Sequence, residues 1–125
     1  MKIEINDSRR ISEIQESFRK VFPYLTIGFF IHYSRDAVRP TNGVSGMRKI
    51  GECRTIHASG EMTITPAMTI HELEEIFRTR YGLEARVFRQ SGKAWLGTSV
   101  TNDWTLDEQN KEGEALSQAK KLMSR

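Results

Sequence analysis

The chain repeats part of its own sequence, and this repeat constrains the fold more than any single motif. Residues 3–22 align without a gap with residues 62–81, at a constant offset of 59. Each copy predicts a short strand, an amphipathic helix and a second strand, in that order. Repeated units of this kind bury their apolar faces against one another, so we expect two equivalent units around one core. The matched pairs are Ile5/Ile64, Ile11/Ile70, Glu13/Glu72, Ile14/Leu73, Glu16/Glu75, Phe18/Phe77, Arg19/Arg78 and Phe22/Tyr81.

Local signals place the helix ends within the two copies. Pro23 ends the first helix, because proline lacks the N–H group that a helix needs, and residues 25–33 then favour a strand. In the second copy, Thr69 and Glu72 form a capping box at the helix start. Gly82 is a natural C-terminal stop. The helix boundaries are therefore clearer in the second copy.

Further elements surround the second copy. Residues 53–58 favour a strand that turns into the repeat. Residues 84–89 and 94–100 flank a serine–glycine pair at 91–92, which predicts a β-hairpin turn. A second capping box at 105–108 predicts the start of a C-terminal helix.

The order of these elements favours one α+β architecture. Two βαβ units in tandem have the order of a ferredoxin-like two-layer sandwich, here with an extra hairpin strand and a C-terminal helix. The alternative is a β-grasp core in residues 52–100 with an N-terminal βαβ addition. We expect one α+β domain over residues 1–104 with a mobile basic loop near 34–51. A partly frayed C-terminal helix is expected over 105–125.

Composition limits the class of protein. The 125 residues are 38% hydrophobic and 28% charged, which is typical of one globular domain. The longest apolar run, residues 27–31, is far too short to cross a bilayer, so no membrane partner is expected. The N-terminus lacks a secretory apolar stretch and the chain has one cysteine, so we expect a cytoplasmic protein. A net charge of +3 is only mildly basic for a nucleic-acid protein.

Alternation along the strands predicts a sheet face, opposite the helices, that carries aromatic and basic side chains. We expect this face or the basic loop to bind a protein partner or a second copy of the chain, because exposed apolar patches commonly mark interfaces. The alternative ligand is single-stranded nucleic acid, whose bases stack on aromatic rings while cations contact phosphates. The candidate residues of the face are Phe30, His32, Arg86, Phe88 and Trp95. Those of the basic loop are Arg35, Arg39, Arg48, Lys49 and Arg54.

No catalytic or metal-binding pattern stands out, so we expect a non-catalytic protein without a cofactor or metal. Cys53 and His57 are four residues apart on a predicted strand, which places them about 13 Å apart, too far for a nucleophile–base pair. Even with His32 they are too few for a zinc site. The three glutamates of residues 72–75 begin a helix, where capping and the helix dipole explain acidic side chains.

Three segments of the chain resemble a family of short bacterial proteins that has no established activity. They are GECR at 51–54, VFRQSGKAWL at 87–96 and DWTL at 103–106. The resemblance covers most of the chain and is tightest over residues 60–113. It implies no catalytic residues, and it implies that a basic, variable loop before Gly51 is normal. It also implies that Trp104 has a structural role and packs against the edge of the core where the chain turns.

Overall fold

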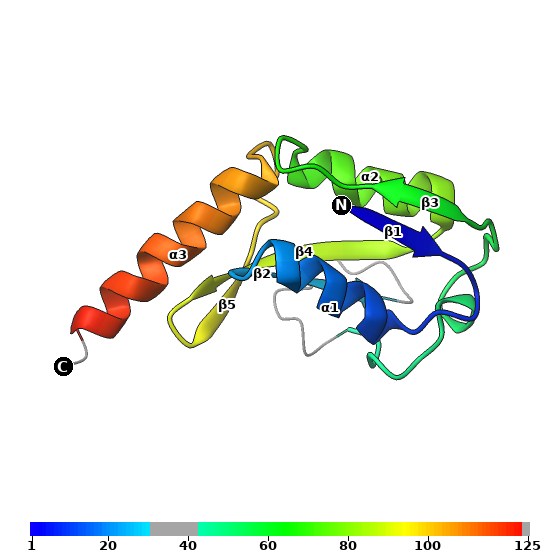
Figure 1. Cartoon of the computed structure of the whole chain (residues 1–125), viewed down its shortest axis with the longest axis horizontal. Helices are drawn as coiled ribbons and strands as arrows, with labels where there is room; N and C mark the ends of the chain where they lie inside the picture. The colour runs from blue at the N-terminus through cyan, green and yellow to red at the C-terminus, as the bar shows by residue number, and fades with distance from the viewer. Residues whose placement is uncertain (31–42, 124–125) are drawn as a thin grey trace.

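The computed structural model describes residues 1–30 and 43–123, and the predicted α+β class is confirmed within them (Figure 1). Within these ranges, none of the helices combines the length and the apolar character that crossing a bilayer requires. In chain order the elements are β1 (Lys2–Ile5), α1 (Ile11–Val21), β2 (Leu25–Phe30), the short 3-10 helix η2 (Ile50–Glu52), β3 (Gly60–Thr63), α2 (Ile70–Tyr81), β4 (Glu84–Ser91), β5 (Ala94–Gly97) and α3 (Leu106–Met123).

The strands divide into two antiparallel sheets. β1 pairs with β3, and a second sheet has the strand order β2-β4-β5. A ferredoxin-like sandwich needs one sheet in which the two strands that follow the helices are not neighbours. Here β2 and β4 pair directly, from Leu25 opposite Arg89 to Phe30 opposite Glu84. The ferredoxin-like order is therefore not confirmed.

The predicted strand at residues 53–58 is wrong. These residues run without strand pairing from η2 to β3, and the buried side chain of Arg54 explains their irregular path. Its guanidinium group donates hydrogen bonds to Asp7 Oδ1 at 2.8 and 3.0 Å and to the Tyr81 carbonyl at 3.1 Å. Because a side chain and not a backbone ladder holds this segment, the first hairpin of the β-grasp alternative does not form.

The structure confirms the two equivalent units that the repeat predicts. Ile3 pairs with Met62, its own equivalent at the offset of 59, so the pairing of β1 with β3 is symmetric about that point. At the second strand of each copy the offset is 58, because Leu25, Ile27 and Phe29 alternate into the core as Leu83, Ala85 and Val87 do. Gly28 pairs with Arg86, its equivalent at this offset, so β2 and β4 are also symmetric. Approximate two-fold symmetry therefore relates the two units.

The same symmetry extends to the start of each helix, where two backbone N–H groups reach a later segment. The four bonds are Ile11 N–H to the Arg48 carbonyl (2.9 Å), Ser12 to Gly46 (2.8 Å), Ile70 to Trp104 (3.1 Å) and His71 to Asn102 (2.9 Å). Residues 46–52 thus correspond to residues 102–108, and η2 corresponds to the first turn of α3. These bonds anchor the described part of the predicted mobile loop, whereas residues 34–42 of that loop lie outside the described residues.

One apolar core joins the two units, and α3 is added beside it. The ring of Phe29 on β2 meets that of Phe77 on α2 edge to face, with centroids 5.3 Å apart. α3 extends away from the other two helices and packs on β4 (Figure 1). Its Gln109 is fully buried and bonds to Arg89 at 2.9 Å and to Thr101 at 2.7 and 2.9 Å. This network fixes the start of α3 to the sheet.

Candidate functional site

Phe30 and Phe88 of the predicted aromatic face are buried in the sheet. Phe88 is fully buried and Phe30 is only 8% exposed. A Cβ atom on Gly28 would stand 3.4 Å from the ring of Phe88 and 3.5 Å from that of Phe30. Because Gly28 has no side chain, both rings pack over it and neither offers a surface to a partner. His32 lies outside the described residues.

The residues of the predicted basic loop are divided between the interior and the surface. Arg54 is buried, and its hydrogen bond lowers the pKa of Asp7. Arg48 and Lys49 are exposed, and Arg48 forms an ion pair with Glu52 at 3.7 Å. Arg54 therefore supports the fold from the interior. Outside the described residues lie Arg35 and Arg39.

Cys53 and His57 do not form a reactive pair. Cys53 is buried, its Sγ donates to the Lys49 carbonyl at 3.4 Å, and burial raises the pKa of its thiol. His57 is exposed, and its Nδ1 lies 2.8 Å from Asp7 Oδ2. Because a protonated thiol is a poor nucleophile, Cys53 is a structural residue. In the part of the chain that the structure describes, no three His, Cys, Asp or Glu side chains gather as metal ligands.

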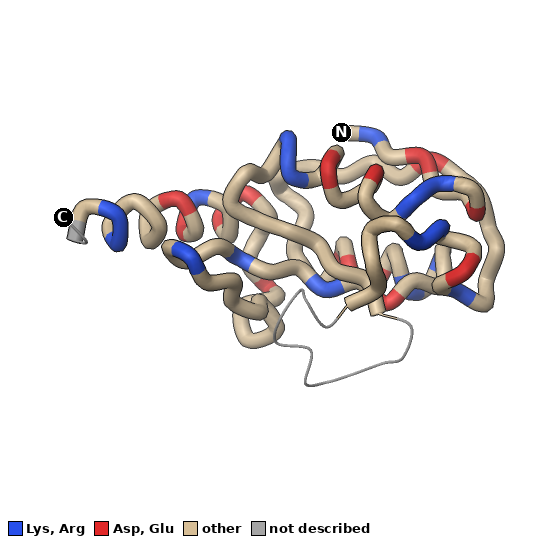
Figure 2. The backbone as a smooth tube through the Cα atoms, turned by 90° about the horizontal axis from the view of Figure 1, so that it is seen from below, with Lys and Arg blue, Asp and Glu red and all other residues tan. Residues whose placement is uncertain are grey.

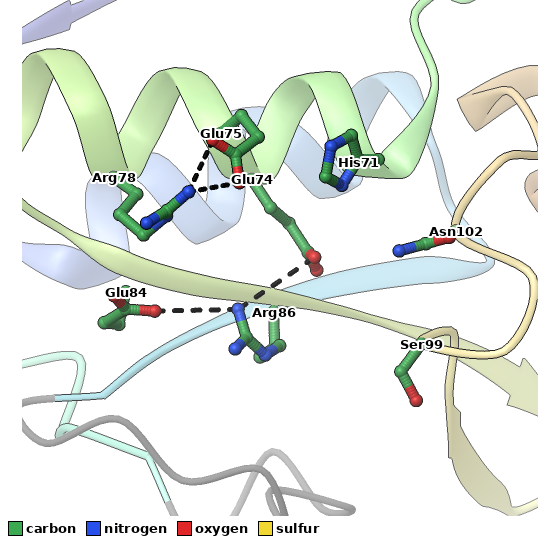
Figure 3. Close-up of a pocket in the computed structure, with 8 residues that line it drawn as sticks. All are labelled: His71, Glu74, Glu75, Arg78, Glu84, Arg86, Ser99 and Asn102. Carbon is green, nitrogen blue, oxygen red and sulfur yellow. Dashed lines mark hydrogen bonds and ion pairs between the residues drawn. The ribbon is translucent and has the colours of Figure 1, made fainter.

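Arg86, the third residue of the predicted face, lies in a pocket between α2, β4 and the segment that follows β5 (Figure 3). The cavity has a volume of about 580 Å³. We call it the Glu74 pocket. Its lining residues are His71, Glu74, Glu75, Arg78, Glu84, Arg86, Ser99 and Asn102.

The fold opens this pocket at the edge of β4. β5 pairs with β4 only from Phe88 onward, so among the described strands none covers residues 84–87 on the side away from β2. α2 runs along this edge and presents residues 71, 74, 75 and 78, which share one face at helical spacing. The chain then returns at Asn102, whose carbonyl accepts the N–H of His71. Backbone contacts therefore set the positions of the pocket walls.

Side chains satisfy the backbone groups of this strand edge. The N–H of Val87 donates to Glu74 Oε2 at 3.1 Å, and its carbonyl accepts from Thr98 Oγ1 at 2.7 Å. Arg86 Nη1 donates to the Ala85 carbonyl at 2.9 Å. An open strand edge is a template for pairing with another chain. These bonds close the edge, so the pocket offers side chains to a ligand.

Glu74 has a strongly perturbed pKa. Its side chain is 15% exposed, and burial raises the pKa of Glu74 to about 7. The charge of Arg86, the Val87 N–H and the charge of His71 oppose this shift, while the carboxylate of Glu84 adds to it. Glu74 Oε1 lies 4.0 Å from Arg86 Nη1, which is beyond hydrogen-bond distance. Oε1 therefore has room for a further donor.

The remaining charges of the pocket are paired. Arg78 Nη2 lies 2.5 and 2.6 Å from the two carboxylate oxygens of Glu75, and this contact lowers the pKa of Glu75. Arg86 Nη1 lies 3.7 Å from Glu84. With Glu74 ionised, the lining carries three carboxylates, two guanidinium groups and one imidazole. Arg86 at 4.0 Å compensates the charge of Glu74 only in part, which favours a cationic ligand.

The first unit has a neutral side chain at the position of Glu74. Gln15 is the equivalent of Glu74, and its Nε2 donates to the Ile27 carbonyl at the edge of β2 at 2.9 Å. A neutral amide thus satisfies a strand edge without burying a charge. A Cβ on Gly46, the equivalent of Asn102, would lie 3.2 Å from Gln15 Oε1, so the first unit is filled where the second is open. The other equivalent pairs are Ser12/His71, Thr26/Glu84 and Gly28/Arg86.

Sequence reasoning missed Glu74. The expectation that capping and the helix dipole explain this carboxylate is wrong, because it faces β4 and is buried there. A signal was present in the repeat itself. The two copies match well around these positions, but the second copy has ionisable side chains where the first has neutral ones. Glu74 stands in place of Gln15, and His71 in place of Ser12.

Comparison of the chain with protein-family models, with curated proteins and with solved structures finds no match. The resemblance inferred from the three sequence segments therefore stays a prediction. Inference about function rests on the geometry of the described residues.

Proposed function

We propose that the protein is a non-catalytic interaction module that binds a lysine or arginine side chain of a protein partner in the Glu74 pocket. One observation supports this most strongly: the equivalent position in the first unit is the neutral Gln15. The first unit folds with a neutral amide there, whereas a buried carboxylate is costly without a cation beside it. A buried titratable group in a cleft is a recurring feature of functional sites.

The chemistry of the ligand follows from the partly compensated charge of the Glu74 carboxylate. Burial disfavours the ionised form of Glu74, and Arg86 at 4.0 Å compensates only in part. An ammonium or guanidinium group bound at Oε1 would supply the missing positive charge and a hydrogen-bond donor. Binding of such a group favours the ionised carboxylate, so it releases a proton near neutral pH.

The contacts of Glu74 favour a binding role over a catalytic one. A carboxyl group that titrates near neutral pH can also serve as a general base. Here, however, Glu74 Oε2 already accepts the Val87 N–H, and His71 acts on Glu74 through its charge. The pair of Glu75 with Arg78 also presents charged groups at this pocket, and charges that complement those of a partner give an interface its specificity.

Short peptides test this function. We would titrate the 15N-labelled protein with a Gly-Ser-Lys-Ser-Gly peptide, and with the same peptide carrying norleucine in place of lysine. The lysine peptide should shift the amide signals of His71, Ser99 and Asn102 with a Kd of about 1 mM, which corresponds to a binding free energy of about −4 kcal/mol. Affinity should rise from pH 5.5 to pH 8.5, because Glu74 ionises over that range.

The matched variants are Glu74→Gln, which keeps the shape and copies the first unit, and Glu16→Gln, which removes an exposed carboxylate outside the pocket. Glu74→Gln should weaken lysine-peptide binding at least about fivefold at pH 8.5, and Glu16→Gln should leave it unchanged. Equal shifts with the norleucine peptide would contradict the proposal. Sedimentation of the protein alone would show whether a second copy is itself the partner.

A further inference from the structure

A second groove lies at the other end of the sheet, between the turn that joins β4 to β5 and the last turns of α3. Its cavity volume is about 620 Å³. We call it the hairpin groove. Its lining residues are Tyr24, Gln90, Gly92, Lys93, Ser117, Gln118, Lys120 and Lys121.

Hydrogen bonds hold the two walls of this groove together. The Gly92 N–H donates to Ser117 Oγ at 3.1 Å, and Lys120 Nζ donates to the Ser91 carbonyl at 3.3 Å. Gly92 has a positive φ of 64°, and a Cβ there would stand 2.8 Å from Lys120 Cδ. Only glycine suits both the turn and the approach of the lysine. The groove is therefore preformed.

The charge of the hairpin groove points to an anionic ligand. Its lining, all within the described residues, holds three lysines and no carboxylate, and Figure 2 marks basic positions near the C-terminal end of α3. A groove lined by one sign of charge attracts ligands of the opposite sign, so a phosphate-bearing ligand suits it.

An aromatic side chain lies on the same sheet face as Gln90, one of the residues that line the groove. Gln90 in the groove is paired with Trp95 across the hairpin, so their side chains share one face of the sheet. Trp95 is half-buried, and the guanidinium group of Arg19 lies 5.3 Å from the centre of its ring. Cations arranged around a partly open aromatic ring are the elements that proteins use to hold single strands, because phosphates contact the cations and bases stack on the ring.

We propose that the hairpin groove binds single-stranded nucleic acid, with Lys93, Lys120 and Lys121 contacting phosphates and Trp95 stacking against a base. The indole on the Gln90 face favours this ligand over an acidic peptide, which would use the lysines but gain nothing from an aromatic ring. This site is separate from the Glu74 pocket and does not depend on the function proposed for it.

Fluorescence anisotropy with a labelled oligothymidylate of about 12 nucleotides tests the proposal. Three phosphate contacts on a single strand predict that log K falls against log salt with a slope of about −2. Raising the salt tenfold should therefore weaken binding about 100-fold. No change in anisotropy at low salt would overturn the proposal.

Two sets of variants locate the site. The triple variant Lys93→Gln, Lys120→Gln, Lys121→Gln should weaken binding at least about tenfold and bring the salt slope close to zero. Trp95→Leu should weaken binding about tenfold with the slope unchanged, because stacking carries no counterions. Circular dichroism of each variant would confirm that the fold is kept.

The matched control is the triple variant Lys2→Gln, Lys49→Gln, Lys111→Gln, which lowers the net charge equally at other places. It should bind as the unmodified chain does. Equal loss in both triple variants would mean that net charge alone attracts the oligonucleotide, which would overturn the proposal. Tighter binding of a polyglutamate peptide than of the oligonucleotide would also overturn it, in favour of an acidic protein partner.

Discussion

Glu74 should make the protein less stable as the pH rises from 4.5 to 7. The pKa of Glu74 is about 7 in the folded chain, against 4.5 for the ordinary carboxyl group. Between these values the folded state binds more protons than the unfolded state, so the free energy of unfolding falls with increasing pH. At 1.36 kcal/mol per pH unit, the loss is about 3 kcal/mol and is complete above pH 7.

The variant Glu74→Gln isolates this effect. Glutamine keeps an oxygen that can accept the Val87 N–H, as Glu74 Oε2 does, and it carries no charge. The variant should match the unmodified chain near pH 4 and exceed it by about 3 kcal/mol at pH 8. For 125 residues this corresponds to an increase in Tm of about 10 °C at pH 8.

Urea unfolding from pH 4 to pH 8 would measure the difference between the two proteins. Other titrating groups cancel in that difference, because the chains differ at one residue. The reverse change at the equivalent position, Gln15→Glu, should destabilise the fold at pH 8, since a carboxylate cannot donate to the Ile27 carbonyl as the amide does. A difference that stays constant from pH 5 to pH 8 would refute the buried carboxylate as its cause.

Two substitutions and one chemical reaction test the packing of buried residues elsewhere in the fold. Arg54→Met should destabilise the fold by about 2 kcal/mol in urea unfolding, because the Tyr81 carbonyl loses a charged donor at 3.1 Å. Gly113→Ala should also destabilise it, although alanine is better in helices by about 1 kcal/mol, since the new Cβ would stand 2.9 Å from Tyr24 Cβ. Cys53 should react with iodoacetamide at least about tenfold more slowly than a cysteine peptide at pH 8, because burial raises its pKa.

Each of these changes has a control or a contradicting result. Arg48→Met removes an exposed guanidinium group and should change stability by no more than about 0.5 kcal/mol. Glu114→Ala, on the exposed side of the same helix as Gly113, should be nearly neutral. A gain in stability from Gly113→Ala would show that Tyr24 moves aside. A Cys53 rate equal to that of the peptide would show that the thiol is open to solvent.

Much of the fold followed from local signals in the sequence. The repeat predicted two equivalent units, and Pro23 and Gly82 predicted the helix ends, because backbone conformation at these residues is a local property. Thr105 and Glu108 do cap the start of α3, as their spacing predicts. The strand partners were not predictable in the same way, since pairing depends on contacts between residues distant in the chain.

The sequence by itself determined the duplicated strand–helix–strand order and the capping of the second and third helices. Only the tertiary structure decided that β2 lies beside β4, which leaves an edge of β4 for Glu74 to reach. It also decided that Phe88 is buried and that Glu74 titrates near neutral pH. The physical reason is the same in each case. Burial and pKa depend on the side chains that other segments place around a residue, and these neighbours cannot be deduced from the local sequence.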